Sequence, residues 1–386
     1  MRAIVKQATQ SGDLQMIYLD YNATTPIDKQ VADEMLPYLY TEYGNPSSGH
    51  ALGRPAKEAV ELARERVAGL LECDRDEIIF TSGGSEANNM AIKGVAHTFK
   101  NKGNHIVTSQ IEHPAVLNPC KFLEKQGYSI SYLPVDENGI VRVELLESLL
   151  TERTILVTIM HANNETGIIQ PLEQIAKICR KHNVLFHTDA SQSVGKIPTK
   201  PAELGVDFLT IAGHKLYAPK GTGALYIRNG IAIEPLIHGA GHEFGKRAGT
   251  ENVLFDVALG KACEIAKQSM EKDNVRALTD YFYTRLKELF GERIRLNGDP
   301  VKKLPNTLNI SFLGMNGAEV LAMLGEDVAA STGSACHSGL VSISPVLKAM
   351  GVPYETARGA VRFSLGRNTT REELDVVLER FMHIRL

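Results

Sequence analysis

Three short stretches of the sequence carry residue types that could together bind and activate one cofactor. The stretch IAGHKLYAPKG places Lys215 among apolar neighbours and between two glycines, unlike a solvated surface lysine. The stretch TSGGSEANN, residues 81–89, follows an apolar run and opens a predicted helix, whose free N–H groups can bind phosphate. The stretch HTDASQ ends another apolar run with Asp189, a carboxylate that needs a cationic partner if it is buried.

Each stretch has an ordinary structural explanation when it is taken alone. Residues 81–89 could form a plain glycine turn with Ser85 as the helix cap, and Asp189 could belong to a structural ion pair. Together, however, the phosphate-binding turn, the strand-end aspartate and Lys215 favour pyridoxal 5'-phosphate as the cofactor. Its aldehyde would form a Schiff base with the lysine, and the aspartate would keep its pyridine nitrogen protonated. The glycine turn lacks the P-loop pattern, so a nucleoside triphosphate is not indicated.

The elements that would position these residues alternate between short apolar runs and amphipathic helical stretches. EIIFTS precedes SEANNMAIKGVAHTF, and TILVTIM precedes LEQIAKICRKH, in which Cys179 lies on the apolar face and is predicted to be a core residue. This alternation predicts a mainly parallel α/β sheet with helices on both faces and ligands at the carboxyl ends of its strands. From about Gly260 the pattern changes, which predicts a second, smaller domain.

Composition narrows the class of protein. The 386 residues are 43% hydrophobic and 23% charged, which is typical of a soluble globular chain. A net charge of −3 without a long basic run argues against a nucleic-acid or anionic-membrane surface. We find no apolar run long enough for a membrane span and no signal sequence. Five scattered cysteines without metal-ligand spacing predict no metal site and suit a reducing cytosol, so we expect a cytoplasmic protein.

Ten ordered motifs then make the chain similar to a known group of enzymes. The order is that of cysteine desulfurases and selenocysteine lyases, in the class V aminotransferase group of fold-type I pyridoxal phosphate enzymes. The motifs are YLDYNATTP, YGNPSSGH, TSGGSEANN, IEHPAV, HANNETG, HTDASQSVGK, GHKLYAPKG, RAGTEN, SACHSG and VRFSLGR.

The resemblance implies a homodimer whose subunits each have a large domain with a mainly parallel seven-stranded sheet and a smaller α+β domain. We place the large cofactor-binding domain at residues 28–262 and the small domain at residues 16–27 and 263–386. Residues 1–15 are expected to be an extension. Such enzymes are associated with iron–sulfur cluster assembly and selenium metabolism.

The resemblance also assigns roles to individual residues. Lys215 matches the Schiff-base lysine, Asp189 the partner of the pyridinium nitrogen, and His113 the ring-stacking histidine that exchanges protons. Arg362 matches the arginine that clamps the substrate carboxylate, a task suited to bidentate geometry. The remaining matches are Gln192 and Asn164 near the ring hydroxyl, with Asn164 also near the substrate; Gly84, Ser85 and His214 at the phosphate; and Thr250, which reaches over from the neighbouring subunit.

Three of these assignments have structural alternatives. His113 precedes a proline and could merely cap the following helix. Arg362 lies in an apolar run and could form a buried ion pair, while Asn163 and Asn164 could be turn residues. The ordered motifs favour the functional roles of His113, Arg362 and Asn164.

Cys336 lies in STGSACHSGLVSISP, a stretch rich in glycine and serine that is typical of a mobile loop. The resemblance makes Cys336 the nucleophile that takes sulfur from the substrate as a persulfide and passes it to an acceptor protein. His337 could favour the reactive thiolate, so we include it among the catalytic residues. Two departures from the desulfurase pattern, Ala212 and His337, look closer to selenocysteine lyases, and the substrate remains open between L-cysteine and L-selenocysteine.

Three functions compete on these observations. The leading hypothesis is a lyase that removes sulfur or selenium from L-cysteine or L-selenocysteine and leaves L-alanine. The alternative enzyme is a class V aminotransferase acting on a small amino acid, which would need a keto-acid acceptor and no loop cysteine. A non-catalytic scaffold is disfavoured because it need not keep Lys215, Asp189, His113, Cys336 and Arg362 together.

Overall fold

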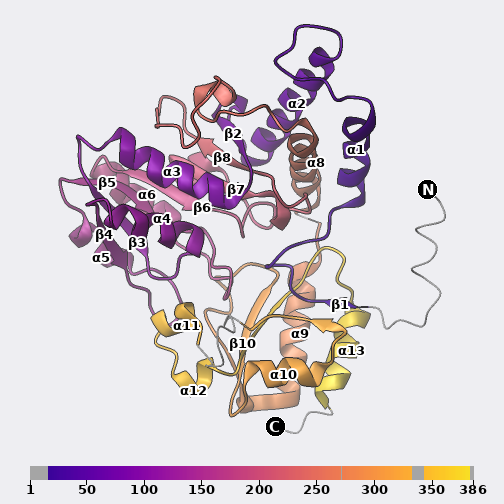
Figure 1. Ribbon diagram of the computed structural model, residues 1–386. Helices are drawn as coiled ribbons and strands as arrows, with labels where there is room; N and C mark the ends of the chain where they lie inside the picture. Colours follow the sequence, from indigo (N-terminus) through magenta and orange to yellow (C-terminus); the bar gives the residue numbers. More distant parts are fainter. Residues whose placement is uncertain (1–15, 271, 333–342, 383–386) are drawn as a thin grey trace.

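The fold was analysed in a computed structural model that describes residues 16–270, 272–332 and 343–382. The described chain forms two parts, each with its own sheet and helices, that lie one above the other in Figure 1. We call these parts the larger layer and the smaller layer. The larger layer occupies the upper part of the view, and the smaller layer holds β10, α9, α10 and α13 below it.

The larger layer is built on a seven-stranded sheet with the order β2-β8-β7-β6-β5-β3-β4. β8 is antiparallel to both β2 and β7, and the other neighbouring strands pair in parallel. In this order the strands are β2 (Ile78–Thr81), β8 (Gly223–Ile227), β7 (Phe208–Ala212), β6 (Leu185–Asp189), β5 (Thr154–Thr158), β3 (His105–Ser109) and β4 (Ser129–Leu133). The predicted mainly parallel, seven-stranded fold-type I sheet is confirmed.

Helices cover both faces of this sheet because its strands are apolar on both sides. Ile78 and Phe80 of β2 point into the core shared with α2, α6 and α8, whereas Ile79 points into the core formed with α3 and α4. This layer's helices are α1 (Lys29–Tyr40), α2 (Gly53–Leu71), α3 (Gly84–Thr98), α4 (Pro114–Glu124), α5 (Val143–Leu149), α6 (Leu172–Lys181), α7 (Pro201–Leu204) and α8 (Val253–Ser269). Short 3₁₀ turns are η2 (Arg75–Glu77), η3 (Gly213–Lys215) and η4 (Glu243–Gly245). Cys179 of α6 is buried, as predicted.

The smaller layer has an antiparallel sheet in the order β12-β10-β9 and a separate parallel pair of β1 and β11. A cluster of phenylalanines, among them Phe312, Phe363 and Phe381, fills its core. Its strands are β1 (Ile17–Tyr18), β9 (Ile294–Leu296), β10 (Thr307–Phe312), β11 (Val328–Ala329) and β12 (Ala360–Ser364). Its helical elements are α9 (Val275–Phe290), η5 (Gly291–Arg293), α10 (Gly317–Leu324) and α13 (Arg371–Met382).

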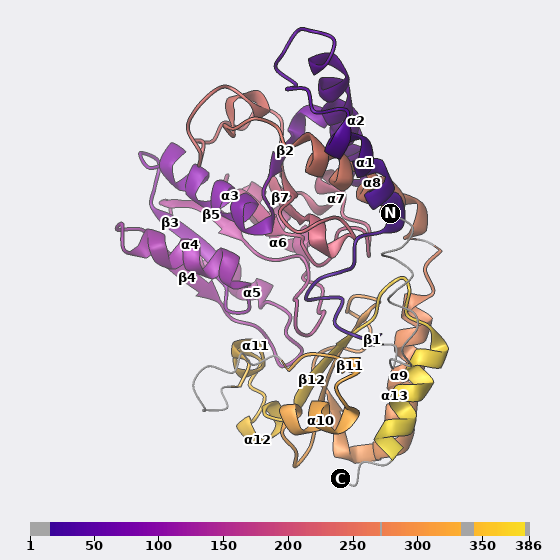
Figure 2. The same cartoon turned by 45° about the vertical axis from the view of Figure 1, so that its right-hand side comes forward.

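Three features bear on the predicted domain boundaries. β1 pairs with β11, so residues from both ends of the described chain meet in the smaller layer. The boundary that we placed at residues 262–263 falls inside α8, which packs against α1 and α2. In addition, α11 (Pro345–Ala349) buries Val346 and Leu347 in the core of the larger layer, and α12 (Tyr354–Ala357) follows it (Figure 2). The division into domains therefore stays a prediction.

Among the described residues, no helix combines the length and the apolar character needed to cross a bilayer.

Candidate active site

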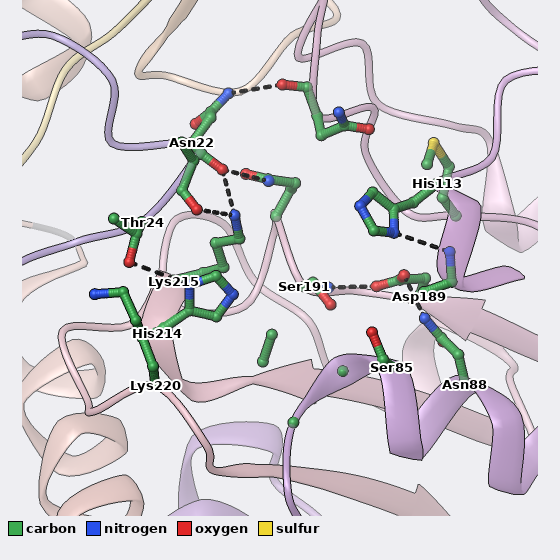
Figure 3. Close-up of a pocket in the computed structure, with 18 of the residues that line it drawn as sticks. Asn22, Thr24, Ser85, Asn88, His113, Asp189, Ser191, His214, Lys215 and Lys220 are labelled. Atoms are coloured by element: carbon green, nitrogen blue, oxygen red, sulfur yellow. Dashed lines mark hydrogen bonds between the residues drawn. The ribbon is translucent and has the colours of Figure 1, made fainter. Parts of the chain in front are cut away.

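A cavity of about 770 Å³ lies at the carboxyl ends of the central strands (Figure 3), and Arg362 of β12 also lines it. Its lining comes from turns that follow β2, β5, β6 and β7, the start of α4, the segment after β1, and one strand of the smaller layer. The predicted site residues that line it are Gly84, Ser85, His113, Asn164, Asp189, Gln192, His214, Lys215 and Arg362. Residues from distant parts of the chain therefore meet in one cavity.

Lys215 ends η3, the short helical turn that follows β7. The backbone carbonyls of Asn22 and Ala23 accept hydrogen bonds from its Nζ at 2.5 and 2.6 Å (Figure 3). Burial and, to a smaller extent, the positive charge of Arg362 lower the pKa of Lys215 to about 8. A larger share of this amine is consequently neutral and nucleophilic near pH 7 than for a solvated lysine.

Asp189 ends β6 and is buried. Oδ2 accepts a hydrogen bond of 2.7 Å from Nδ2 of Asn88, and Oδ1 accepts one of 2.9 Å from the backbone N–H of Ser191. These bonds fix the carboxylate in place while it lines the cavity, as Figure 3 shows. A fixed, buried carboxylate suits a protonated ring nitrogen of a bound heterocycle.

His113 both caps a helix and lines the cavity, so the two roles considered for it are compatible. It is the N-cap of α4, where Nδ1 accepts a hydrogen bond of 3.1 Å from the backbone N–H of Ala115. Because Nδ1 accepts, a neutral ring carries its proton on Nε2. Burial lowers the pKa of His113, which favours this neutral form. The cap therefore fixes which nitrogen of His113 can give up or take a proton.

The predicted phosphate site lies at the first turn of α3, where helical N–H groups are free to bind an anion. A Cβ atom at Gly84 would come within 3.0 Å of Oγ of Ser191 and 3.2 Å of Cβ of Ala212, so a larger residue would crowd this turn. The helix cap is Gly83, with φ of 141°, and Ser85 lies one residue inside the helix. The expectation that Ser85 caps α3 was wrong, because glycine takes the left-handed backbone position that precedes the helix.

His214, which was also predicted to contact the phosphate, lines the same cavity, and so does Lys220. Nδ1 of His214 lies 3.2 Å from Oγ1 of Thr24, and the two atoms share a hydrogen bond (Figure 3). Burial, with Lys215 and Lys220 adding positive charge, lowers the pKa of His214 to about 4. His214 is therefore neutral near pH 7, and Lys220 brings a positive charge to this end of the cavity. Lys220 was not among the predicted residues.

Arg362 lies in the middle of β12 and reaches the cavity from the smaller layer. Nη2 donates to Oδ1 of Asp20 at 2.6 Å, and Nη1 donates to the backbone carbonyl of Asn164 at 3.0 Å. Nε is buried without a hydrogen-bond partner among the described residues. The guanidinium is thus oriented by an ion pair and still has donor capacity for a substrate carboxylate.

The adjacent asparagines of HANNETG have different surroundings. Asn163 is fully buried, and its Oδ1 accepts hydrogen bonds from the backbone N–H groups of Glu165 and Thr166 at 2.9 and 3.0 Å. Asn163 is therefore a turn residue. Asn164 lines the cavity, and its backbone carbonyl accepts from Arg362.

Among the described residues, one predicted site residue is not brought into the cavity of this chain. Thr250 is exposed and does not line it. Cys336 and His337 lie outside the described residues, so their predicted roles stay predictions.

Three further residues of the site were missed by sequence reasoning. Asn88 could have been found, because it lies four residues after Gly84 on the same face of α3. Asn22 gave no such signal, since it meets Lys196 across 174 positions of the sequence, whereas Lys196 lies four residues after Gln192 and bonds to it.

Comparisons with known proteins agree with this geometry. A family model described as aminotransferase class-V matches residues 17–377. The chain belongs to this family. It is 50% identical over 366 residues to the cysteine desulfurase IscS of Dictyoglomus turgidum, which covers 94% of this chain and 93% of that relative.

The chain is also similar in fold and sequence to proteins of known structure. A structure described as a NifS-like protein is 40% identical with a TM-score of 0.90, covering 96% of this chain and 99% of that one. A structure of SspA in complex with cysteine is 36% identical with a TM-score of 0.82, covering 92% of this chain and 100% of that one. Because its relatives of 50% and 46% identity are named cysteine desulfurase IscS, the chain belongs with the cysteine desulfurases within the class-V aminotransferases.

Class-V aminotransferases depend on pyridoxal phosphate, and the residues of this cavity fit it. The glycine turn before α3 gives a phosphate room that a Cβ atom would fill, Asp189 is held rigidly, and Lys215 is the amine between them. Oγ1 of Thr222 lines the cavity as well and is buried without a partner among the described residues. When bound, the cofactor supplies an aldehyde and a protonated ring that accepts electrons.

Proposed function

We propose that this protein is a cysteine desulfurase that removes the sulfur of L-cysteine and releases L-alanine. The observation that carries the proposal is the meeting of Lys215, Asp189 and Arg362 around one cavity, with the amine of Lys215 shifted toward its neutral form. The close relatives named cysteine desulfurase support the same activity.

The residues divide the work between binding and proton transfer. Arg362 binds the substrate carboxylate and stays oriented by Asp20. Lys215 holds the cofactor and, once released, takes the proton from the substrate α-carbon at Nζ. His113 exchanges a proton at Nε2, because Nδ1 is engaged at the start of α4.

Sulfur transfer is assigned to Cys336. Its thiolate attacks the substrate sulfur, the carbon–sulfur bond breaks, and a sulfur–sulfur bond forms on the enzyme as a persulfide. The substrate carbon takes a proton and leaves as alanine. An acceptor thiol, from a partner protein or a small molecule, then removes the sulfur.

The test of this function is a balance of products. L-cysteine and a thiol reductant are added to the holoenzyme without any keto acid, and alanine and sulfide are measured. We expect equal amounts of both, and none from Lys215→Ala. Product formation that requires a keto acid would instead support an aminotransferase.

We propose in addition that L-selenocysteine is a second substrate. Ala212 lines the cavity where many desulfurases have a serine, and His337 adjoins the loop cysteine. A side-by-side comparison of kcat/KM on L-cysteine and L-selenocysteine tests this. A ratio unchanged by His337→Ser would contradict the role given to His337.

We further infer a twofold homodimer. Thr250 lies outside the cavity of its own chain, and apolar side chains of α1 are exposed, including Leu36, Leu39 and Tyr40. Exposed apolar patches of this kind are typical of protein interfaces. Sedimentation of the holoenzyme tests the proposal, and a fully active monomer would contradict it.

A further inference from the structure

A second lysine, Lys196, shares the partner Asn22 with Lys215. Its Nζ is 3.2 Å from Oε1 of Gln192 and 3.2 Å from Oδ1 of Asn22. A lysine side chain only donates hydrogen bonds, so both amides must turn their oxygen atoms toward it. Lys196 therefore determines the orientation of two amide side chains at once.

Asn22, the first of these residues, joins the two layers. Its Oδ1 also accepts from Nδ2 of Asn306 at 3.1 Å, and its Nδ2 donates to Oγ1 of Thr307 at 2.9 Å. Its backbone carbonyl accepts from Nζ of Lys215 at 2.5 Å. Asn22 is fully buried, so its amide has little freedom to find other partners. The position of the Lys215 amine thus depends on a residue that Lys196 helps to hold.

Gln192, the second residue, lines the cavity. Since its Oε1 accepts from Lys196, its Nε2 is the end left to donate, and it does so to the backbone carbonyl of Asn22 at 3.0 Å. A donor group there suits an anionic oxygen on a bound ring, whereas an amide oxygen would repel it. Without Lys196, the amide of Gln192 would lose one of the two hydrogen bonds that fix its orientation and could turn over more easily.

We propose that Lys196 is a positioning residue that fixes the amides of Gln192 and Asn22, so that the site offers a hydrogen-bond donor to the cofactor ring and a fixed cradle to the amine of Lys215. This inference rests on the proposed roles of Lys215 and Gln192.

The charges around Lys196 determine the expected sign of the effect. Burial first, and then the positive charges of Lys215 and Arg362, lower the pKa of Lys196 to about 7. On its other side, Lys196 lines a second cavity of about 340 Å³ together with Asp273, Arg276 and Arg367. The positive charge of Lys196 lies near Lys215, and Gln192 offers a donor to the ring oxygen. Both disfavour protonation of the nitrogen atom that joins Lys215 to the cofactor, which we call the junction. Removing Lys196 should therefore make that junction easier to protonate.

The test uses the holoenzyme and the pH dependence of the bound cofactor's visible absorption band. We expect Lys196→Met to raise the midpoint pH of the band by roughly half a unit to one unit and to weaken cofactor binding several-fold. Lys196→Arg, which keeps the charge and the donors, should change the midpoint less. The matched control is Lys181→Met, because Lys181 ends α6, is 67% exposed and forms an ion pair with Glu147. Far-UV circular dichroism checks that each variant is folded.

A double-mutant cycle separates positioning from a merely structural role. If Lys196 acts through Gln192, Lys196→Met should change the midpoint less in a Gln192→Leu background than in the wild type. Additive effects, or a midpoint unchanged in Lys196→Met, would overturn the inference. A wild-type protein that binds no pyridoxal phosphate would instead overturn the proposed function, so the two failures are distinguishable.

Discussion

The residues on the two sides of the cavity are positioned by different parts of the fold. On the sheet side, Asp189 ends β6 and Lys215 ends the short turn η3 that follows β7, and parallel strands end at the same edge. On the opposite side, Arg362 lies in mid-strand and is placed by partners far away in the sequence, including Asp20, which is 342 positions distant. The comparison teaches that local sequence places the backbone of Asp189 and Lys215 at the edge of the sheet, whereas the placement of Arg362 in the cavity depends on long-range pairing.

The first and largest effect is expected on the sheet side. Lys215→Ala removes the amine that holds the cofactor and moves the α-proton, so activity should fall by roughly 10³-fold or more. Borohydride treatment followed by mass spectrometry should no longer find the cofactor covalently attached. Attachment that survives in the variant would show that another lysine has this role.

The second prediction concerns the reactivity of Lys215 in the cofactor-free protein. Because burial and Arg362 lower its pKa to about 8, the neutral amine should accumulate as the pH rises through 8 rather than near 10.4. Labelling with an amine reagent, quantified by peptide mass spectrometry, should therefore show a midpoint near pH 8. A lysine in a short peptide is the reference, and an identical midpoint in both would contradict the buried environment.

The third prediction tests the opposite side of the cavity. Arg362→Lys keeps the positive charge and loses the planar fork that binds a carboxylate through two N–H groups. We expect KM for L-cysteine to rise about tenfold or more, corresponding to about 1.4 kcal/mol or more, while cofactor binding changes little. Equal losses of cofactor and substrate binding would mean that the two sides of the cavity are not independent.

The smallest effect on activity is expected at Glu112, a fully buried carboxyl group beside His113 that does not line the cavity. Its Oε1 accepts hydrogen bonds from Ser109 and from the backbone of Met160, and burial raises its pKa to about 8. The folded state therefore holds a proton that the unfolded state releases above about pH 4.3, so this group's contribution to stability falls as the pH rises from about 4.5 to 8. Glu112→Gln has no carboxyl group that titrates at this position, so its stability should not show this decrease between about pH 4.5 and 8.

Thermal unfolding of both proteins measures this difference. The melting temperature of Glu112→Gln relative to the wild type should increase between pH 5 and 8 and then stay level. A difference that does not depend on pH would contradict the raised pKa.

The alternation of apolar runs and helical stretches predicted the mainly parallel sheet and the residues that follow its strands, because both depend on local sequence. The number of seven strands came from the family resemblance. It did not find Asn22, whose partners Gln192 and Lys196 are 170 and 174 positions away, and it gave no role to Lys196, although Lys196 lies four residues after Gln192. It gave Ser85 the capping position that belongs to Gly83, because serine is the commoner cap and the left-handed backbone is not visible in the sequence. The cytoplasmic location and the domain boundaries stay predictions.

The central claim, sulfur transfer from the cavity to Cys336, is tested most directly on intact protein. Holoenzyme is incubated with L-cysteine without reductant and digested, and the cysteine peptides are compared by mass spectrometry. We predict one added sulfur atom on the Cys336 peptide, none on the peptides of Cys73, Cys120, Cys179 and Cys263, and an equal amount of alanine. Stoichiometric alanine with no sulfur on Cys336, or undiminished activity on cysteine in Cys336→Ala, would contradict the claim.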